Sequence, residues 1–177
     1  MTRSLGSTDL KRLHREWRRR AGGRLAVLLD SVATPTNVGA ILRTAAALRV
    51  EDVFLCGRTP DEHVGGVQKT ALGSQRFLTF HRCATPADAV AAVAAAGYRL
   101  VGIELAEGAE PIHEVDLTGA TCLAVGHEDR GLSAAVAGAA ERLAFIPQLG
   151  RIGSLNVATA ASIALYEARR QGWPAEP

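Results

Sequence analysis

The sequence predicts an α/β protein with an open, mostly parallel sheet that helices cover on both faces. Two observations predict this class. Short apolar stretches rich in Val, Ile and Leu recur along the chain, and segments with helical periodicity lie between them. The composition of the 177 residues, 47% hydrophobic and 21% charged, is that of an ordinary globular protein and excludes collagen, coiled coils and extensive disorder.

Five apolar stretches are expected to form the strands. Each is short and aliphatic, as burial on both faces of a parallel sheet requires. They are Leu25–Leu29, Val53–Cys56, Arg99–Ile103, Cys122–Val125 and Leu143–Ile146. Because ligands bind at the carboxyl ends of the strands in such sheets, the residues that follow these stretches are the first candidates for a site.

Four segments between the strands are expected to be helices. The first carries one apolar stripe, made of Val38, Ile41, Leu42, Ala45 and Leu48. Asn37 is expected to cap this helix. The others are Pro86–Ala96, which Thr85 opens, Ser133–Ala140, and Leu155–Arg170, which Ser154 is expected to cap.

The three cysteines, Cys56, Cys83 and Cys122, are odd in number, widely spaced and outside any CxxC pattern. We interpret them as small buried apolar residues in a reducing compartment. The N-terminus lacks the apolar core of a signal peptide, and no apolar run is long enough to span a bilayer. The sequence therefore predicts a soluble, cytoplasmic protein with no membrane association.

Residues 1–24 are expected to form a basic extension, predicted to be helical, and residues 25–177 a single domain. The extension carries seven Arg and one Lys against Asp9 and Glu16, a net charge of +6, whereas the rest of the chain sums to −4. Cations interleaved with a Trp are typical of surfaces that bind nucleic acid. The candidate binding residues are Lys11, Arg12, Arg15, Arg18, Arg19 and Arg20. In a second, compatible interpretation, Leu10, Leu13 and Trp17 face the body from one side of an amphipathic helix.

Motifs for binding nucleotide phosphates are absent. GxGxxG does not occur, and Gly126–Ser133 has P-loop spacing but Leu132 in place of the lysine. Two carboxylates inside that segment, Glu128 and Asp129, would repel a triphosphate. Neither a GxSxG motif nor a cluster of metal ligands occurs. These absences exclude most hydrolases, kinases and Rossmann-type dinucleotide enzymes, and we expect no metal.

The first candidate site segment is Asp30–Leu48, in which a strand leads into a helix. Arg43 lies off the apolar stripe of this helix, and its neighbours one turn away are glycine or alanine. In one interpretation a ligand approaches this face of small side chains and meets the guanidinium. In the other, the face packs on another helix or subunit and Arg43 reaches solvent. The residues alone leave both interpretations open.

Two further segments follow predicted strands. The loop Gly126–Gly131 would place Glu128 at the carboxyl end of the sheet, although a charged surface turn is an alternative. The loop Ile146–Asn156 leads into an apolar helix, and Asn156 sets an amide beside a buried surface, where a polar group needs a partner. Local backbone bonding by Ser154 and Asn156 is the alternative here.

These three segments, in this order and at this spacing, resemble the three motifs of the SpoU/TrmH family of RNA ribose 2′-O-methyltransferases. The matching residues are Asn37, Gly39 and Arg43-Thr44-Ala45, then Gly126, Glu128 and Gly131-Leu132-Ser133, then Ile146-Pro147, Ser154-Leu155-Asn156-Val157 and Glu167. The resemblance covers residues 25–170. Three collinear motifs, each at the end of a predicted strand, are hard to obtain by chance.

The resemblance implies a deep trefoil knot in the C-terminal part of the sheet, a homodimer, and S-adenosylmethionine as the cofactor, bound in the knot. The cofactor-binding residues that it implies are Ile103, Glu104, Leu105, Gly126, Ile146, Gln148 and Leu155. The catalytic residues that it implies are Arg43, Glu128, Ser154 and Asn156, with Asn37 and Gly39 as structural residues of the first motif. A cofactor bound in this way would explain the absence of GxGxxG.

The reaction that the resemblance implies is the attack of a ribose 2′-hydroxyl on a sulfonium methyl group, which neutralises charge and requires no metal. Because a guanidinium does not give up its proton in a protein, we expect Arg43 to hold a phosphate rather than to act as the base. Glu128, Ser154 and Asn156 would then orient the guanidinium and the ribose.

The basic extension resembles the short extension of the tRNA guanosine members of the family, and we expect it in place of the extra N-terminal domain that many rRNA-directed members carry. We therefore expect an RNA substrate, tRNA before rRNA. A substrate in rRNA and a small-molecule substrate on the same fold are alternatives. A non-catalytic RNA-binding protein is a further alternative, which the intact Arg43, Ser154 and Asn156 disfavour.

Overall fold

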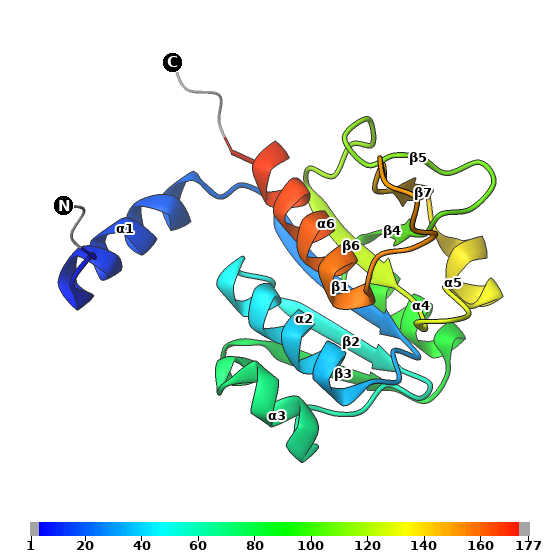
Figure 1. The fold of residues 1–177 in the computed structure, drawn as a ribbon, viewed down its shortest axis with the longest axis horizontal. Coiled ribbons are helices and arrows are strands. Elements are labelled where there is room, and N and C mark those ends of the chain that lie inside the picture. The colour runs from blue at the N-terminus through cyan, green and yellow to red at the C-terminus, as the bar shows by residue number, and fades with distance from the viewer. Residues whose placement is uncertain (1–3, 174–177) are drawn as a thin grey trace.

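The computed structural model describes residues 4–173, and a parallel sheet forms its centre (Figure 1). Within these residues the sheet has seven strands in the order β3-β2-β1-β6-β4-β7-β5, and every pairing between them is parallel. The strands are β1 (Arg24–Asp30), β2 (Asp52–Cys56), β3 (Thr79–Cys83), β4 (Arg99–Ile103), β5 (Glu110–Pro111), β6 (Ala120–Val125) and β7 (Arg142–Phe145). The predicted parallel α/β architecture is confirmed.

All five predicted strands are present, and two more were not expected. β3 is an edge strand, and none of its five residues is fully buried. It therefore lacks the continuous apolar run of a central strand. β5 has two residues and pairs only with β7 at the other edge. Both omissions have the same cause, because edge strands are buried on fewer sides and carry a weaker apolar signal.

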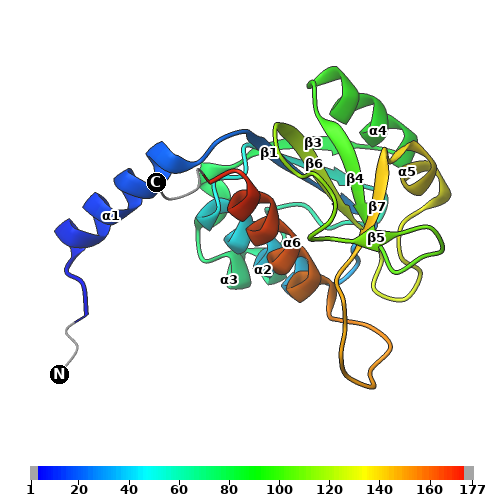
Figure 2. The same cartoon turned by 90° about the horizontal axis from the view of Figure 1, so that it is seen from above.

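Helices cover both faces of the sheet (Figure 2). One face packs against α2 (Pro35–Ala47), α3 (Gly65–Ala71) and α6 (Val157–Gln171), and the other against α4 (Pro86–Ala95) and α5 (Ala134–Ala139). The short α3, which opens with two glycines, and the 3-10 turn Ser74–Phe77 were not expected. None of the helices in residues 4–173 is both long enough and apolar enough to cross a bilayer.

Two helix caps differ from the expectation. α2 begins at Pro35, whose missing N–H suits the first helical position, so Asn37 lies inside the first turn and does not cap it. α6 is capped by Asn156 and not by Ser154: its Oδ1 accepts hydrogen bonds from the backbone N–H groups of Ala158 (2.9 Å) and Thr159 (3.3 Å). The asparagines of the first and third motifs are thereby positioned at the starts of helices.

The N-terminal helix α1 (Ser7–Arg20) projects away from the sheet (Figure 1). Of its fourteen residues, all within the described part of the chain, none is buried. Leu10 and Leu13 remain 42% and 37% exposed, so the expectation that they pack on the body is wrong. The reason is that the helix meets the body only at its C-terminal end, where Trp17 contacts Trp173.

The three cysteines are free thiols on the sheet. Cys56 and Cys122 are buried, in agreement with their interpretation as small buried apolar residues, whereas Cys83, on the edge strand β3, is only half-buried. Burial raises the pKa of the Cys56 thiol to about 12, so it stays protonated at neutral pH and is a poor nucleophile.

Candidate active site

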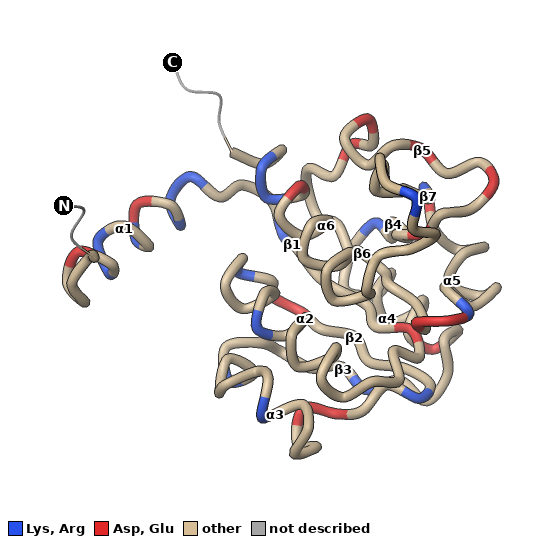
Figure 3. Tube along the Cα trace, viewed as in Figure 1, with Lys and Arg blue, Asp and Glu red and all other residues tan. Residues whose placement is uncertain are grey.

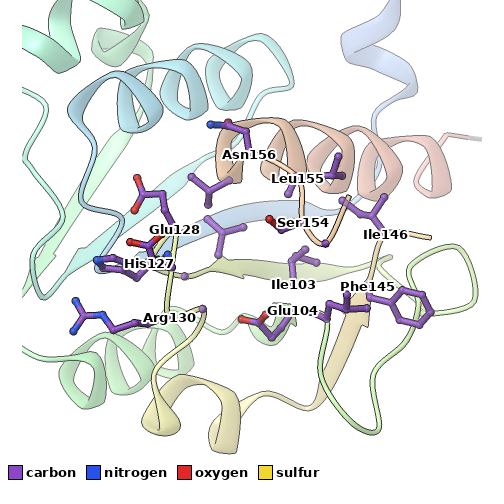
Figure 4. Close-up of a pocket in the computed structure, with 18 of the residues that line it drawn as sticks. Ile103, Glu104, His127, Glu128, Arg130, Phe145, Ile146, Ser154, Leu155 and Asn156 are labelled. Atoms are coloured by element: carbon purple, nitrogen blue, oxygen red, sulfur yellow. Dashed lines mark hydrogen bonds between the residues drawn. The ribbon is translucent and has the colours of Figure 1, made fainter. Parts of the chain in front are cut away.

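A cavity of about 690 Å³ opens at the carboxyl ends of β4, β6 and β7, beside the start of α6 (Figure 4). Ten of the residues predicted for the site line it: Ile103, Glu104, Leu105, Gly126, Glu128, Ile146, Gln148, Ser154, Leu155 and Asn156. Phe145, which the sequence did not single out, and Val157 of the third motif add apolar wall. Chain segments about 50 residues apart meet here because parallel strands end at the same edge of a sheet.

A chain of hydrogen bonds joins the three motifs at the mouth of this cavity. The Asn37 amide donates to Glu128 Oε1 (3.0 Å), and the Asn156 amide donates to Asn37 Oδ1 (3.1 Å). A carboxylate only accepts, so Asn37 must turn its nitrogen to Glu128 and its oxygen to Asn156. Asn156 must then turn its nitrogen to Asn37, which directs its oxygen to the α6 N–H groups. The orientation of both amides is therefore set by Glu128.

Glu128 also holds the loop that precedes α2. Its two carboxylate oxygens accept hydrogen bonds from the backbone N–H groups of Ala33 and Thr34, each at 3.0 Å. Partial burial acts to raise the pKa of Glu128, but the hydrogen bonds from Ala33, Asn37 and Thr34 outweigh burial and lower the pKa to about 2. Glu128 is thus ionised at neutral pH, and it accepts three hydrogen bonds from the protein.

Two further carboxylates hold the loop between β6 and α5. Asp30, 1% exposed at the end of β1, accepts a hydrogen bond from Ser133 N (2.7 Å), and Glu104 accepts one from Leu132 N (2.9 Å). Gly131, with φ +68°, lies so close to Glu104 that a side chain there would overlap its carboxylate. This role of Asp30 was not predicted from the sequence, although an acid at the end of an apolar strand was the available signal.

Arg43 lies apart from the other predicted catalytic residues. It is exposed on α2, and it is not among the described residues that line the cavity. Gly39, one turn before it, packs against Val67 and Thr70 of α3. The second interpretation of this face therefore holds for Gly39, while Arg43 reaches solvent. Glu128 is bonded to Ala33, Thr34 and Asn37, so the expectation that it orients the Arg43 guanidinium is not met in this structure.

The predicted nucleic-acid-binding cations all lie on α1 and are exposed (Figure 3). Two of them have acidic neighbours on the same helix: Arg12 is 3.8 Å from Asp9, and Arg20 is 3.1 Å from Glu16. Such exposed pairs contribute little energy, so they leave the arginines available to an anionic partner. In residues 4–173, no group of three or more His, Cys, Asp or Glu side chains is arranged to hold a metal ion.

A parallel α/β sheet with a cavity at its carboxyl edge, where three collinear motifs meet through Glu128, Asn37 and Asn156, defines the class of the SpoU-type proteins. The chain belongs to the SpoU rRNA Methylase family, whose sequence pattern matches residues 24–166. This assignment agrees with the resemblance of the three motifs.

Comparisons with individual proteins agree with the family. The chain is 33% identical over 147 residues to a tRNA (guanosine(18)-2′-O)-methyltransferase of Escherichia coli (strain K12), covering 83% of this chain and 63% of that protein. It is 34% identical over 148 residues to a 23S rRNA (guanosine-2′-O-)-methyltransferase of Acinetobacter baylyi, covering 83% and 60%.

Among solved structures, an AdoMet-bound rRNA methyltransferase from Sinorhizobium meliloti superimposes with a TM-score of 0.78 at 36% identity, covering 85% of this chain and 57% of that one. The chain thus spans about three fifths of the length of these relatives.

Proposed function

We propose that this protein is an S-adenosylmethionine-dependent methyltransferase that modifies a ribose 2′-hydroxyl of RNA, with tRNA as the preferred substrate. The observation that carries the proposal is the hydrogen-bond chain from Glu128 through Asn37 to Asn156, which unites the three motifs at one cavity. The relatives act on tRNA and on rRNA, so an rRNA substrate is the second candidate. The exposed basic helix α1 favours RNA over a small molecule.

The residues of the cavity fit the proposed cofactor. Ile103, Ile146 and Leu155 supply apolar wall for a flat heterocycle, and Gln148 Oε1 is buried with no hydrogen-bond partner in residues 4–173. A buried acceptor without a partner is costly, and an amino group of the ligand would satisfy it. Glu104 also faces the cavity, with one oxygen engaged by Leu132 N (Figure 4). When bound, S-adenosylmethionine supplies the sulfonium methyl group that the ribose hydroxyl attacks.

The side chains at the cavity mouth then position the acceptor RNA. Each amide nitrogen of Asn37 and Asn156 carries two hydrogens and uses one within the chain described above, so one remains for a ribose or phosphate oxygen. Ser154 lines the same mouth and adds a hydroxyl. Glu128, with its pKa near 2, is too weak a base to take the hydroxyl proton, so we assign it to positioning.

Arg43 requires a separate role, since it lies outside the cavity that holds the other three predicted residues. Its planar guanidinium is suited to gripping a phosphate with two parallel hydrogen bonds. We propose that Arg43 binds a phosphate of the acceptor strand and so aligns the ribose. The basic residues of α1 contribute further phosphate contacts, which raise affinity without taking part in the chemistry.

We also propose a homodimer. Leu149 and Ile152, in the loop before α6, and Ile163, on α6, are exposed large apolar side chains on neighbouring elements. Exposed apolar side chains grouped in this way are typical of a protein interface. A second copy seated on this surface would cover them and would lie next to the cavity that the same loop lines.

A trefoil knot belongs to the same proposal. β7 lies between β4 and β5 in the sheet, although β4 and β5 are consecutive in the chain. The connection 104–109 therefore crosses the carboxyl end of β7, from which the chain leaves towards α6. Backbone hydrogen bonds from Glu104 N to Ala144 O (2.9 Å) and from Ile112 N to Phe145 O (2.8 Å) bind both sides of this crossing. The free thiols fit a cytoplasmic setting, in which we place the activity.

Two measurements test the proposal. Calorimetry should detect binding of S-adenosylmethionine and of its demethylated product, but not of ATP or NAD. Labelled methyl transfer to separated tRNA and rRNA pools, followed by alkaline hydrolysis, should leave the label in an alkali-resistant dinucleotide, because alkaline cleavage needs a free 2′-hydroxyl. Nuclease mapping then identifies the nucleotide. Binding of ATP without a response to the methyl donor, or label in alkali-labile products, would overturn the assignment.

A further inference from the structure

An aromatic cluster joins α1 to the end of α6, and the proposed chemistry makes no use of it. Trp17 and Trp173 are the two tryptophans of the chain, and their ring centroids lie 5.0 Å apart at an interplanar angle of 57°. Tyr166 supports Trp173 edge-on, at 5.5 Å and 84°. Trp17 remains 41% exposed, so part of its ring is open to a ligand.

The cluster is held in place by the backbone beside it. Gly22 N, just after α1, donates to Gly172 O, just after α6, at 3.2 Å. Arg169, 5% exposed, donates to the carbonyl oxygens of Leu48 (2.7 Å), Gly22 (3.2 Å) and Gly23 (3.1 Å). It also donates to the carbonyl oxygen of Arg49, and a buried guanidinium bonded to four separate carbonyls fixes the end of α1 relative to α6. The position of the exposed Trp17 ring is therefore fixed relative to α6.

Cations surround the cluster. The guanidinium of Arg20 lies over the Trp17 ring, 5.1 Å from its centroid. Figure 3 shows basic residues along the end of α1 and at the end of α6. The exposed ones beside the cluster are Arg18 and Arg19, which follow Trp17 in the chain, Arg49, which donates to Arg18 O (3.5 Å), and Arg170. The acidic groups at this place are Glu16, 3.1 Å from Arg20, and Glu167, 2.8 Å from Arg170, and cations outnumber them.

We propose that the Trp17–Trp173 cluster is a stacking site for an unpaired nucleobase of the RNA substrate, with the surrounding arginines binding the flanking phosphates. Aromatic faces bordered by arginine are what proteins use to hold unpaired bases. The excess of cations favours RNA over a second copy of this chain as the occupant. This inference rests on the proposed function and deepens it.

The position of the cluster defines the substrate further. α6 runs from its cap Asn156 at the cavity to Gly172 at the cluster, which is roughly 24 Å at about 1.5 Å per residue. The stacked base is therefore not the methylated nucleotide. The substrate is a folded RNA that carries an unpaired base roughly 24 Å from the modified ribose, and a short single strand without structure cannot hold both positions in register.

Binding measurements on matched variants test the site. The probes are a labelled RNA hairpin with an unpaired purine loop and a blunt RNA duplex of equal length. Trp17→Leu keeps apolar volume but removes the aromatic face, and Trp17→Phe keeps a face. Trp17→Leu should weaken hairpin binding roughly 5- to 150-fold and duplex binding by much less, while Trp17→Phe stays within a few-fold of the parent. Since no charge is removed, the salt dependence should not change.

A second readout uses the two tryptophans themselves. Because both belong to the cluster, intrinsic tryptophan emission should fall when the hairpin binds and stay nearly constant when the duplex binds. Arg19→Gln is the matched control: it should reduce the salt dependence for both probes and leave their ratio of affinities unchanged.

Three results would overturn the stacking site. If Trp17→Leu weakens binding of the hairpin and of the duplex equally, Trp17 only anchors α1. Unchanged hairpin affinity would show that no base stacks there. Loss of a dimer in sedimentation of Trp17→Leu would show that a second copy covers the cluster. The parent protein's methyl transfer to RNA is measured separately, so failure of the proposed function is seen independently of these binding results.

Discussion

Replacing Glu128 with glutamine tests whether this carboxylate holds the site together. Gln keeps the shape of Glu but carries one oxygen and one NH₂ group. The NH₂ group would face the backbone N–H of Ala33 or Thr34, which now donate to the carboxylate at 3.0 Å. A donor facing a donor leaves a hydrogen bond unmade. The Asn37 and Asn156 amides also lose the carboxylate acceptor that fixes which way each of them is turned.

The size of the effect follows from the pKa of Glu128, which the native hydrogen bonds lower from 4.5 to about 2. At about 1.4 kcal/mol per unit, the full difference is roughly 3 kcal/mol. The carboxylate is partly exposed, so solvent screening reduces its share of the free energy of unfolding to about 1 to 2 kcal/mol. At about 2 to 4 °C per kcal/mol for a domain of this size, we expect the Tm to fall by roughly 2 to 8 °C.

The direction in which this stabilisation changes with pH is also determined. The folded pKa of Glu128 lies below its unfolded value, so the stabilisation is complete above about pH 4.5 and is lost as the pH falls towards 2. A protonated carboxyl resembles an amide, so the stability gap between the parent and Glu128→Gln should be constant from pH 5 to 7 and narrow below pH 4.5.

Urea unfolding of both proteins between pH 3 and 7 measures this gap. Asp129→Asn is the matched control, because the neighbouring Asp129 is exposed and its carboxylate accepts no hydrogen bond from residues 4–173. We expect the control to unfold like the parent. A parent and a Glu128→Gln variant of equal stability at pH 7, with the same dependence on pH, would refute the positioning role.

The remaining predictions concern the acceptor, the basic helix and a helix contact. Arg43→Ala and Arg43→Lys should both abolish most methyl transfer while leaving cofactor affinity within a few-fold in calorimetry, because Arg43 lies outside the cavity and lysine lacks the planar fork; substantial activity in Arg43→Lys would contradict bidentate phosphate binding. Deleting residues 1–20 should flatten the slope of log affinity for RNA against log salt by roughly two to four, with a higher KM, a retained kcat and unchanged cofactor binding. Because α1 buries no residue, the Tm of the truncated protein should change little. A large loss of Tm with an unchanged salt slope would instead support a purely structural helix. Gly39→Ala should destabilise the fold by about 1 to 3 kcal/mol in urea unfolding, since its Cβ would overlap Thr70 Oγ1 and the Val67 carbonyl oxygen; parent-like stability would show that α2 and α3 can separate freely.

The sequence could predict the elements whose signal is local. Central strands such as β1 and β6 are buried on both faces, so their residues are aliphatic without interruption and easily recognised. The same holds for α4, where Thr85 and Asp88 form a capping box next to Pro86. The edge strands β3 and β5 and the short α3 lack this signal, because neighbours on only one side impose little pattern on them.

The sequence by itself therefore determined the parallel α/β class, the central strands and the residues that gather at the carboxyl edge, because apolar burial and motif spacing are written in the order of the residues. Only the tertiary structure decided what those residues bond to. Asn37 turned out to face Glu128 and Asn156, and Leu10 and Leu13 turned out to face solvent. The reason is that a hydrogen bond or a covered face depends on a partner about 90 to 120 residues away, and which partner arrives is settled by the packing of the whole sheet.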